Sequence, residues 1–348
     1  MLEVVSWRER ERWNALVSTF KDCDAYSLAS YAEAFRLHGD GEPRLFYGEE
    51  DGVRAFNVVM TRDVASDPKF SGKLPQGKYF DLATPYGYGG WIVEGEGAFE
   101  PIFRAYEAYC VEHGIVSEFA RFHPILRNAE RVAAYYEPQT LGPVVALDLE
   151  SPEIVWKNMI DKCRCAVNKA RKSGLEIVQD DSEEAYRVFK EIYDQTMIAD
   201  GARDYYFFND EFYASVRRDL GAAAKLFLAR LPDGATIAAA IMLLCNDKMN
   251  YHLSASLRGD YGRLGATNFI LYSAAVWGAE RGYKTLYLGG GVGAREDALF
   301  KFKKSFYRRE LEYSFQIGRK IFDRDAYRTL LELRGDVDDP NFFPAYRG

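Results

Sequence analysis

The sequence predicts a mixed α+β protein made of two similar domains, and three observations point to this class. The chain has 348 residues, more than one ordinary hydrophobic core organises, so two domains of about 150 residues are expected. Its apolar share of 48% is typical of a folded globular protein rather than a disordered one. One order of helices, hairpin, helix and strand occurs twice along the chain, which predicts mixed sheets flanked by helices.

In the first half, two helical patterns precede a hairpin, and a third helical pattern precedes a strand. Asp51-Gly52 stands between two apolar runs, which is a strong hairpin signal. Gly114 follows the third helical pattern, where glycine commonly ends a helix. The predicted elements are helices over residues 7–20, 28–37 and 99–112, and strands over residues 44–47, 53–61 and 115–122.

The second half repeats this order. Pro232-Asp233-Gly234 corresponds to the first hairpin turn, and Gly282 ends a long helix as Gly114 does in the first half. The predicted elements are helices over residues 183–199 and 210–220, a strand over 225–231, two strands split by residues 246–247, the helix that ends at residue 281, and a strand over 285–288.

The junction between the two halves has the signature of a helix start. Ser151 is a good N-cap residue, and Pro152 suits the first helical position because its missing N–H would be unpaired there anyway. We therefore predict two domains, at residues 1–150 and 151–348.

A glycine-rich turn over residues 258–267 links a strand over residues 251–255 to the long helix. Such a turn is an anion site, because unpaired backbone N–H groups and the helix dipole face the bound charge. The turn therefore predicts a ligand that carries phosphates. An ordinary glycine-rich loop with a normal helix cap is the alternative that the residues leave open.

A lysine-rich helix follows the triple glycine at residues 289–291 and contains the run F-K-K-S-F at residues 302–306. A cation beside a reacting carbonyl group stabilises the negative charge that develops on its oxygen. Phe302 and Phe306 are four residues apart, so the same run could instead be a packing face whose lysines stay in solvent.

The doubled order of elements, with the triple glycine and the F-K-x-x-F run, resembles two tandem copies of the Gcn5-related N-acyltransferase (GNAT) fold. In this doubled form it is similar to the Fem-type peptidoglycan-bridge aminoacyltransferases. The runs Y-G-Y-G-G at 86–90, R-D-Y-Y-F-F at 203–208 and F-F-P-A-Y-R at 342–347 agree with this resemblance, which covers nearly the whole chain. It implies a degenerate first copy and a second copy with the main cleft. Fem enzymes often carry a coiled-coil arm, for which this sequence has no heptads.

The resemblance also implies roles for individual residues. Lys303 matches the lysine of F-K-x-x-F and would be the catalytic residue that stabilises charge beside the reacting carbonyl. Arg203 would bind a phosphate or carboxylate of the acceptor, a task that suits its forked guanidinium group. Tyr206 and Tyr251 are further substrate-binding candidates, although either could be a structural tyrosine. The donor phosphates would be bound by Gly262, Arg263, Gly265, Ala266 and Thr267.

Composition and motifs argue against several other classes. A net charge of −7 argues against a protein that coats nucleic acid, and no DNA partner is expected. Scattered histidines and the absence of paired zinc-spaced cysteines predict no metal site, and no G-x-S-x-G hydrolase motif occurs. Without a signal peptide or a run long enough to span a bilayer, the chain is expected to be cytoplasmic.

We therefore expect an acyltransferase that forms an amide between an activated acyl or aminoacyl donor and an amine acceptor. The resemblance implies a peptidoglycan or other cell-envelope precursor as acceptor, and only a lipid-linked acceptor would bring the enzyme to a membrane surface. Basic runs over residues 162–172 and 301–309 favour aminoacyl-tRNA as donor, and no tightly bound cofactor is expected. The alternatives are an acyl-CoA-dependent N-acyltransferase of envelope polysaccharide or natural-product biosynthesis, and a non-catalytic module that binds a phosphorylated sugar or nucleotide.

Overall fold

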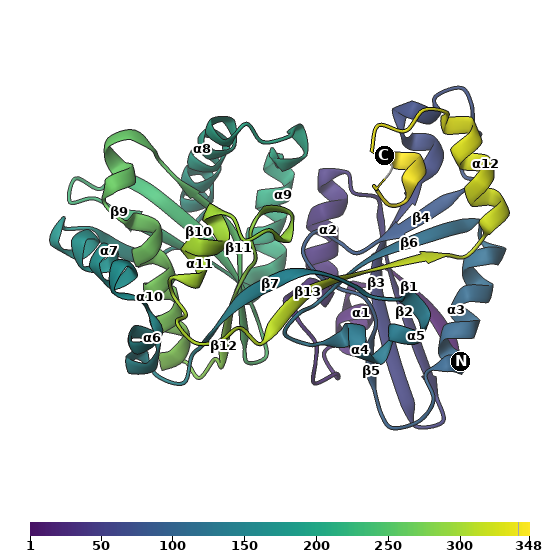
Figure 1. Ribbon diagram of the computed structural model, residues 1–348, viewed down its shortest axis with the longest axis horizontal. Coiled ribbons are helices and arrows are strands. Elements are labelled where there is room, and N and C mark those ends of the chain that lie inside the picture. The colour runs from purple at the N-terminus through teal and green to yellow at the C-terminus, as the bar shows by residue number, and fades with distance from the viewer. Residues whose placement is uncertain (340) are drawn as a thin grey trace. The chain divides into compact units, whose positions relative to one another are not determined.

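The computed structural model describes residues 1–339 and 341–348, and the chain divides into two compact units. Unit 1 comprises residues 1–140 and 315–348, and unit 2 comprises residues 141–314. Each unit has a mixed arrangement of strands with helices packed on it (Figure 1). The fold class is the predicted one. The division differs from the predicted domains, because residues 315–348 belong to unit 1.

The sheet of unit 2 is formed by β7 (Gln139–Asp148), β8 (Glu176–Gln179), β9 (Ala224–Arg230), β10 (Thr236–Cys245), β11 (Lys248–Ser256) and β12 (Thr285–Gly289). Their order is β7-β12-β11-β10-β9-β8. β11 and β12 are parallel, and the other neighbouring pairs in this order are antiparallel. β10 is central because residues 237–244 are apolar and buried on both faces of the strand.

The helices of unit 2 are α6 (Pro152–Asn158), α7 (Asp161–Lys172), α8 (Glu183–Asp200), α9 (Asp210–Ser215), α10 (Ala266–Glu280) and α11 (Ala298–Lys304). α10 packs on β9 and β10 and is itself covered by α6 and α7, whereas α8 packs on β10 and β11 (Figure 1). The predicted N-cap is confirmed, since the Ser151 hydroxyl accepts a hydrogen bond from the N–H of Ile154. The helix predicted over residues 210–220 is α9 followed by a π-helical turn, Val216–Leu220.

Unit 1 contains β1 (Leu2–Ser6), β2 (Glu42–Glu50), β3 (Val53–Asp63), β4 (Phe80–Ala83), β5 (Ile92–Glu94), β6 (Ile115–Phe122) and β13 (Tyr313–Ile321). Their order is β1-β2-β3-β4-β6-β13, and β5 pairs with β3. The predicted hairpin is β2 and β3, joined at Asp51, whose φ of 46° is the left-handed conformation of a tight turn.

The helices of unit 1 are α1 (Arg10–Val17), α2 (Ala29–His38), α3 (Glu100–Glu112), α4 (Asn128–Arg131), α5 (Ala133–Tyr136) and α12 (Arg324–Arg334). α3 leads into β6, and β6 pairs in parallel with β4. α10 leads in the same way into β12, which pairs in parallel with β11. Each unit therefore contains one pair of parallel strands joined by a connection that includes a helix, as the repeated order in the sequence predicts.

The C-terminal segment belongs to unit 1 because its side chains are part of that core. β13 pairs antiparallel with β6. Tyr346 is fully buried, and its hydroxyl lies 2.9 Å from Oγ of Ser117. The Arg347 guanidinium donates to Oδ2 of Asp81 at 2.5 Å, and Asp81 is fully buried on β4. A buried charge pair of this kind anchors the last residues to the sheet.

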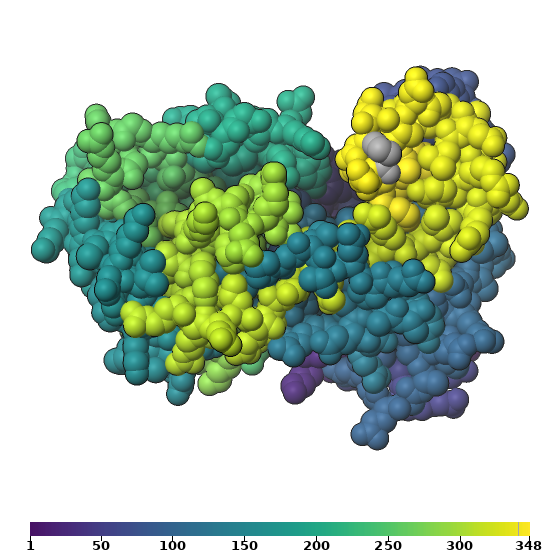
Figure 2. Space-filling view, in the orientation of Figure 1, coloured from purple at the N-terminus to yellow at the C-terminus, as the bar shows by residue number. Residues whose placement is uncertain are grey.

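α11 lies on the surface of unit 2, where its segment is the yellow-green one in the space-filling view (Figure 2). Its Lys301 and Leu299 side chains are exposed, whereas Phe300 and Lys303 are buried. Among the helices of the described residues, none is long and apolar enough to cross a membrane.

Candidate active site

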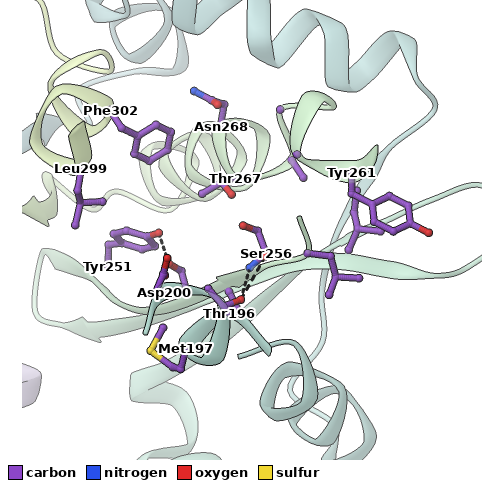
Figure 3. Close-up of a pocket in the computed structure, with 17 residues that line it drawn as sticks. Thr196, Met197, Asp200, Tyr251, Ser256, Tyr261, Thr267, Asn268, Leu299 and Phe302 are labelled. Carbon is purple, nitrogen blue, oxygen red and sulfur yellow. Dashed lines mark hydrogen bonds between the residues drawn. The ribbon is translucent and has the colours of Figure 1, made fainter. Parts of the chain in front are cut away.

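A cavity of about 480 Å³ lies in unit 2 between α8, β11 and the start of α10. Figure 3 shows Leu299 and Phe302 of the α11 segment at one end of this cavity and Tyr261 at the other, with Thr267 facing Ser256 between them. We refer to it as the α8–α10 cavity. Its volume is typical of a small-molecule site.

The sheet opens beside this cavity, because β11 and β12 are paired along only part of their length. Parallel pairing joins residues 248–250 to residues 285–287. After Asn250, β11 still pairs with β10 on its other side, but the described residues show no further pairing with β12. We call the gap that begins after Asn250 and Tyr287 the β11–β12 fork. A backbone edge left open in this way can pair with an extended ligand.

The start of α10 forms an anion-binding end of the cavity. Gly265 is the N-cap residue with a φ of 74°, and no side chain caps the helix. A Cβ atom at Gly265 would lie 2.7 Å from the carbonyl oxygen of Ala166, so only glycine fits there. The first N–H groups of α10 therefore remain available to a negatively charged ligand at the cavity wall, which Ala266 and Thr267 form.

Four of the five predicted phosphate-binding residues meet at this end. Gly262, Gly265, Ala266 and Thr267 line the cavity, whereas Arg263 is exposed and outside the lining.

Lys303 projects into the β11–β12 fork. Its Nζ donates a hydrogen bond of 2.7 Å to the carbonyl oxygen of Gly290, which follows β12, and lies 6.0 Å from the ring centroid of Tyr251 on β11. The side chain is only 9% exposed. Burial lowers the pKa of Lys303 to about 8, and the nearby Asp297 carboxylate opposes that shift. Lys303 therefore presents a shielded ammonium group near neutral pH.

Asp297 fixes the loop that holds this lysine. Its carboxylate accepts from the N–H of Phe300 at 2.9 Å as the N-cap of α11, and from the N–H of Val292 at 3.0 Å. A Cβ atom at Gly291 would lie 2.3 Å from Oδ1 of Asp297, so this close approach requires glycine at position 291. The carboxylate thus joins the loop after β12 to the helix that carries Lys303.

The predicted tyrosines lie in different places. Tyr251 lines the cavity, its hydroxyl donates to Oγ of Ser254, and burial raises its pKa to about 12. Tyr206 is half-buried outside the lining, where its ring packs edge-on against Tyr205. The structure therefore brings Tyr251, but not Tyr206, to the cavity.

Arg203 is exposed in the loop between α8 and α9, and it does not line the cavity. Within the part of the chain that the structure describes, its side chain makes no hydrogen bond or ion pair. Its guanidinium group is therefore available to an external anion.

The segment of the chain that forms this cavity matches a known domain family. Residues 157–304 match the family model of an acetyltransferase (GNAT) domain, and this range includes the fork, the glycine-rich turn and Lys303. The protein is an acyltransferase. No protein of curated function matches the chain.

Solved structures show that the tandem GNAT fold extends over the whole acyltransferase. FemX aligns with a TM-score of 0.68 at 15% identity, over 96% of this chain and 99% of FemX. The C-terminal domain of a proposed lysylphosphatidylglycerol synthetase from Agrobacterium fabrum aligns with a TM-score of 0.58 at 16% identity, over 93% and 95% of the two chains. A tandem GNAT protein of the clavulanic acid biosynthesis pathway aligns with a TM-score of 0.50 at 11% identity, over 93% and 99%.

Several residues that line the acyltransferase cavity had no signal in the sequence. Thr196 and Asp200 come from the end of α8, about 60 residues before the glycine-rich turn. Asp200 forms an ion pair with Arg258, the first residue of that turn. Ser254 and Ser256 also line the cavity, and their spacing by two on a strand, which places both on one face, could have identified them. Over residues 1–339 and 341–348, no acidic, histidine or cysteine cluster suits a metal ion.

We expect Arg203→Lys to raise the KM for the acceptor about tenfold, because lysine keeps the charge but loses the fork that binds an anion through two hydrogen bonds. The melting temperature should not change, since the Arg203 side chain has no partner among the described residues. Acceptor and donor titrations of the purified variant measure the two KM values. Arg281→Lys, at the exposed end of α10, is the matched control. An unchanged acceptor KM would remove Arg203 from the binding site.

Proposed function

We propose that this acyltransferase forms an amide bond by moving an aminoacyl group from aminoacyl-tRNA to an amine. The observation that carries this proposal is the buried ammonium group of Lys303 in the β11–β12 fork. An ammonium ion has three N–H donors, and Gly290 takes one of them, so two remain for a ligand. A cation in a shielded fork is suited to a carbonyl group whose oxygen becomes negative.

The reaction follows from this placement. The acceptor nitrogen attacks the carbonyl carbon of the donor ester, and the carbonyl electrons move to the oxygen, which Lys303 stabilises. The oxyanion collapses, the C–N bond remains, and the ester C–O bond breaks. The ribose hydroxyl leaves with the proton that the amine loses. Asp200 is the carboxylate in the cavity lining, and it is paired with Arg258, so we assign no protein base.

Binding contributes the rest of the catalysis. The N–H groups at the start of α10 would bind a donor phosphate, and the edge of β11 would align the acyl group with Lys303. Holding donor and acceptor together turns a reaction between two molecules into one within a complex.

The donor class is supported by two considerations. The fold resembles FemX and a proposed lysylphosphatidylglycerol synthetase, a name that implies transfer of a lysyl group. Residues 298–309 contain five basic and no acidic side chains, as a polyphosphate donor requires. Acyl-CoA is the second candidate, because the fold also resembles a tandem GNAT protein of clavulanic acid biosynthesis. For the acceptor we propose an amine of a peptidoglycan or other cell-envelope precursor, met in the cytoplasm.

The donor is tested by supplying each one separately. With radiolabelled aminoacyl-tRNA and a panel of amine acceptors that includes peptidoglycan precursors, we expect labelled amide that RNase treatment of the donor abolishes. With acyl-CoA and the same acceptors, we expect no product above the rate without enzyme. Product that survives RNase and saturates with acyl-CoA would replace our donor by the second candidate.

A further inference from the structure

Helix α7 has one apolar and one strongly basic face. Cys163, Val167 and Ala170 are buried in the core of unit 2. Three exposed lysines on the remaining surface, Lys162, Lys169 and Lys172, define what we call the α7 basic face. No ion pair involves these three lysines within residues 1–339 and 341–348. Their charge is therefore available to an external polyanion.

The α7 basic face lies next to the anion-binding end of the α8–α10 cavity. The close approach of Gly265 places the cap of α10 against the backbone of Ala166, in the middle of α7. One turn earlier, the Asn268 amide donates to Sγ of Cys163 at 3.3 Å, and Asn268 lines the cavity. A ligand bound at the start of α10 therefore meets α7 directly.

A second basic segment continues this surface. The N–H of Ile160 donates to the carbonyl oxygen of Ser305 at 3.0 Å, and the N–H of Arg308 donates to that of Asn158 at 2.8 Å. These bonds join the start of α7 to the end of α11, and Figure 2 shows the teal and yellow-green segments on one face of unit 2. Residues 161–172 contain five basic side chains and one acidic, in a chain whose net charge is −7. Positive charge is thus concentrated around the cavity.

The geometry points to the α7 basic face as the docking surface for the sugar–phosphate backbone of an RNA donor whose 3′ end enters the cavity. This inference rests on the proposed aminoacyl-tRNA function. Lys162 and Lys172 are ten residues apart, which is about 15 Å along a helix. A row of that length reaches several successive phosphates, whereas the phosphates of a single acyl-CoA would be taken up mainly by the turn at Gly265.

The same face is poorly suited to a lipid surface. A helix that lies on a membrane inserts apolar side chains into it. The apolar side of α7 is already covered by α10 and the rest of the core. Among residues 158–172, Ile160 is the one large apolar side chain that is exposed.

Arg171 contributes through a different contact. Its guanidinium carbon lies 5.0 Å from the ring centroid of Tyr272 and 5.8 Å from that of Trp156. These rings hold the charged group in place at the edge of the face. We therefore leave Arg171 unchanged in the test, because its removal would also disturb the packing of α6, α7 and α10.

The test neutralises the face and compares two donors. We expect Lys162→Gln/Lys169→Gln/Lys172→Gln to raise the KM for aminoacyl-tRNA at least about tenfold at low salt and to leave kcat unchanged. The slope of log KM against log salt should fall by about 2 to 3, since each of the three lost phosphate contacts removes about 0.7 to 0.9 of a unit. An aminoacylated CCA trinucleotide, too short to run along the row of three lysines, should keep its wild-type KM. The control is Arg187→Gln/Arg217→Gln/Arg218→Gln, on α8 and the π-helical turn.

Each other outcome has a distinct meaning. A triple lysine variant with the wild-type KM and salt slope for aminoacyl-tRNA overturns the docking surface. An equal loss with the trinucleotide also overturns it, because the lysines would then act on the cavity itself. If only binding to vesicles with anionic lipids is lost, the face contacts a membrane and the RNA inference is wrong. If the wild-type enzyme uses neither aminoacyl donor, the proposed function fails before any variant is compared.

Discussion

Lys303→Met is expected to fold normally and to lose at least about a hundredfold in kcat, the scale of one lost oxyanion partner in a shielded site. Methionine fills the volume of the lysine stem, and the substitution removes a buried charge whose burial is unfavourable. The melting temperature should therefore change little. Single-turnover assays under saturating donor and acceptor isolate the chemical step. A variant that keeps wild-type turnover would return Lys303 to an ordinary structural role.

The pH profile gives this prediction a second readout. Because burial lowers the pKa of Lys303 to about 8, the side chain is an ammonium ion below that pH and a neutral amine above it. If the cation stabilises the oxyanion, kcat should fall as pH rises through about 8. Lys303→Arg keeps its charge over this range, so any activity it retains should lack the alkaline decline. A decline that persists in the arginine variant would belong to another group.

The sequence identified those parts of the site that depend on local signals. Gly265 could be singled out because it belongs to a glycine-rich turn that opens a helix, where free N–H groups can bind an anion. The strand over residues 115–122 and the hairpin turn at Asp51 agree with the structure, since alternation, glycine stops and turn residues are all encoded within a few positions. Lys303 could be singled out through the F-K-x-x-F run, although its role is still a prediction.

The rest depends on contacts between distant parts of the chain. The sequence did not indicate that residues 315–348 return to unit 1, because the bond from Arg347 to Asp81 joins positions 266 apart in sequence. The π-helical turn after α9 has no signature distinct from that of an α-helix. Arg263 and Tyr206 lie in the predicted segments, but neither residue lines the cavity. Local patterns do not show which residues of a segment face a cavity.

Unit 1 contains a buried carboxylate on which its core depends. Glu118 on β6 is fully buried. It accepts hydrogen bonds from the Asn57 amide at 2.8 Å, from the Tyr106 hydroxyl at 2.9 Å and from the Tyr136 hydroxyl at 2.6 Å. Trp91 donates in turn to the Tyr136 hydroxyl at 3.1 Å. Burial raises the pKa of Glu118, and the hydrogen bonds from these donors oppose that shift without cancelling it. The carboxyl group is thus the common acceptor of polar groups from several elements of unit 1.

We expect Glu118→Ala to lower the free energy of unfolding by about 3–5 kcal/mol, because three buried donors lose their acceptor and a cavity opens. Urea denaturation, followed by the fluorescence of buried Trp91, measures the change. Glu107→Ala is the matched control, since it breaks a partly exposed ion pair with Lys320 that contributes less than about 1 kcal/mol.

Glu118→Gln separates the hydrogen bonds from the charge. It keeps the shape and one acceptor, so we expect a smaller loss than with alanine. The pKa of Glu118 is raised in the folded state, so the folded protein favours the protonated form, and this contribution to stability is present at low pH and lost as pH rises. The advantage of the wild type over the glutamine variant should therefore shrink with increasing pH. An advantage that grows with pH would mean that the folded state favours the ionised carboxylate, and that its three donors outweigh its burial.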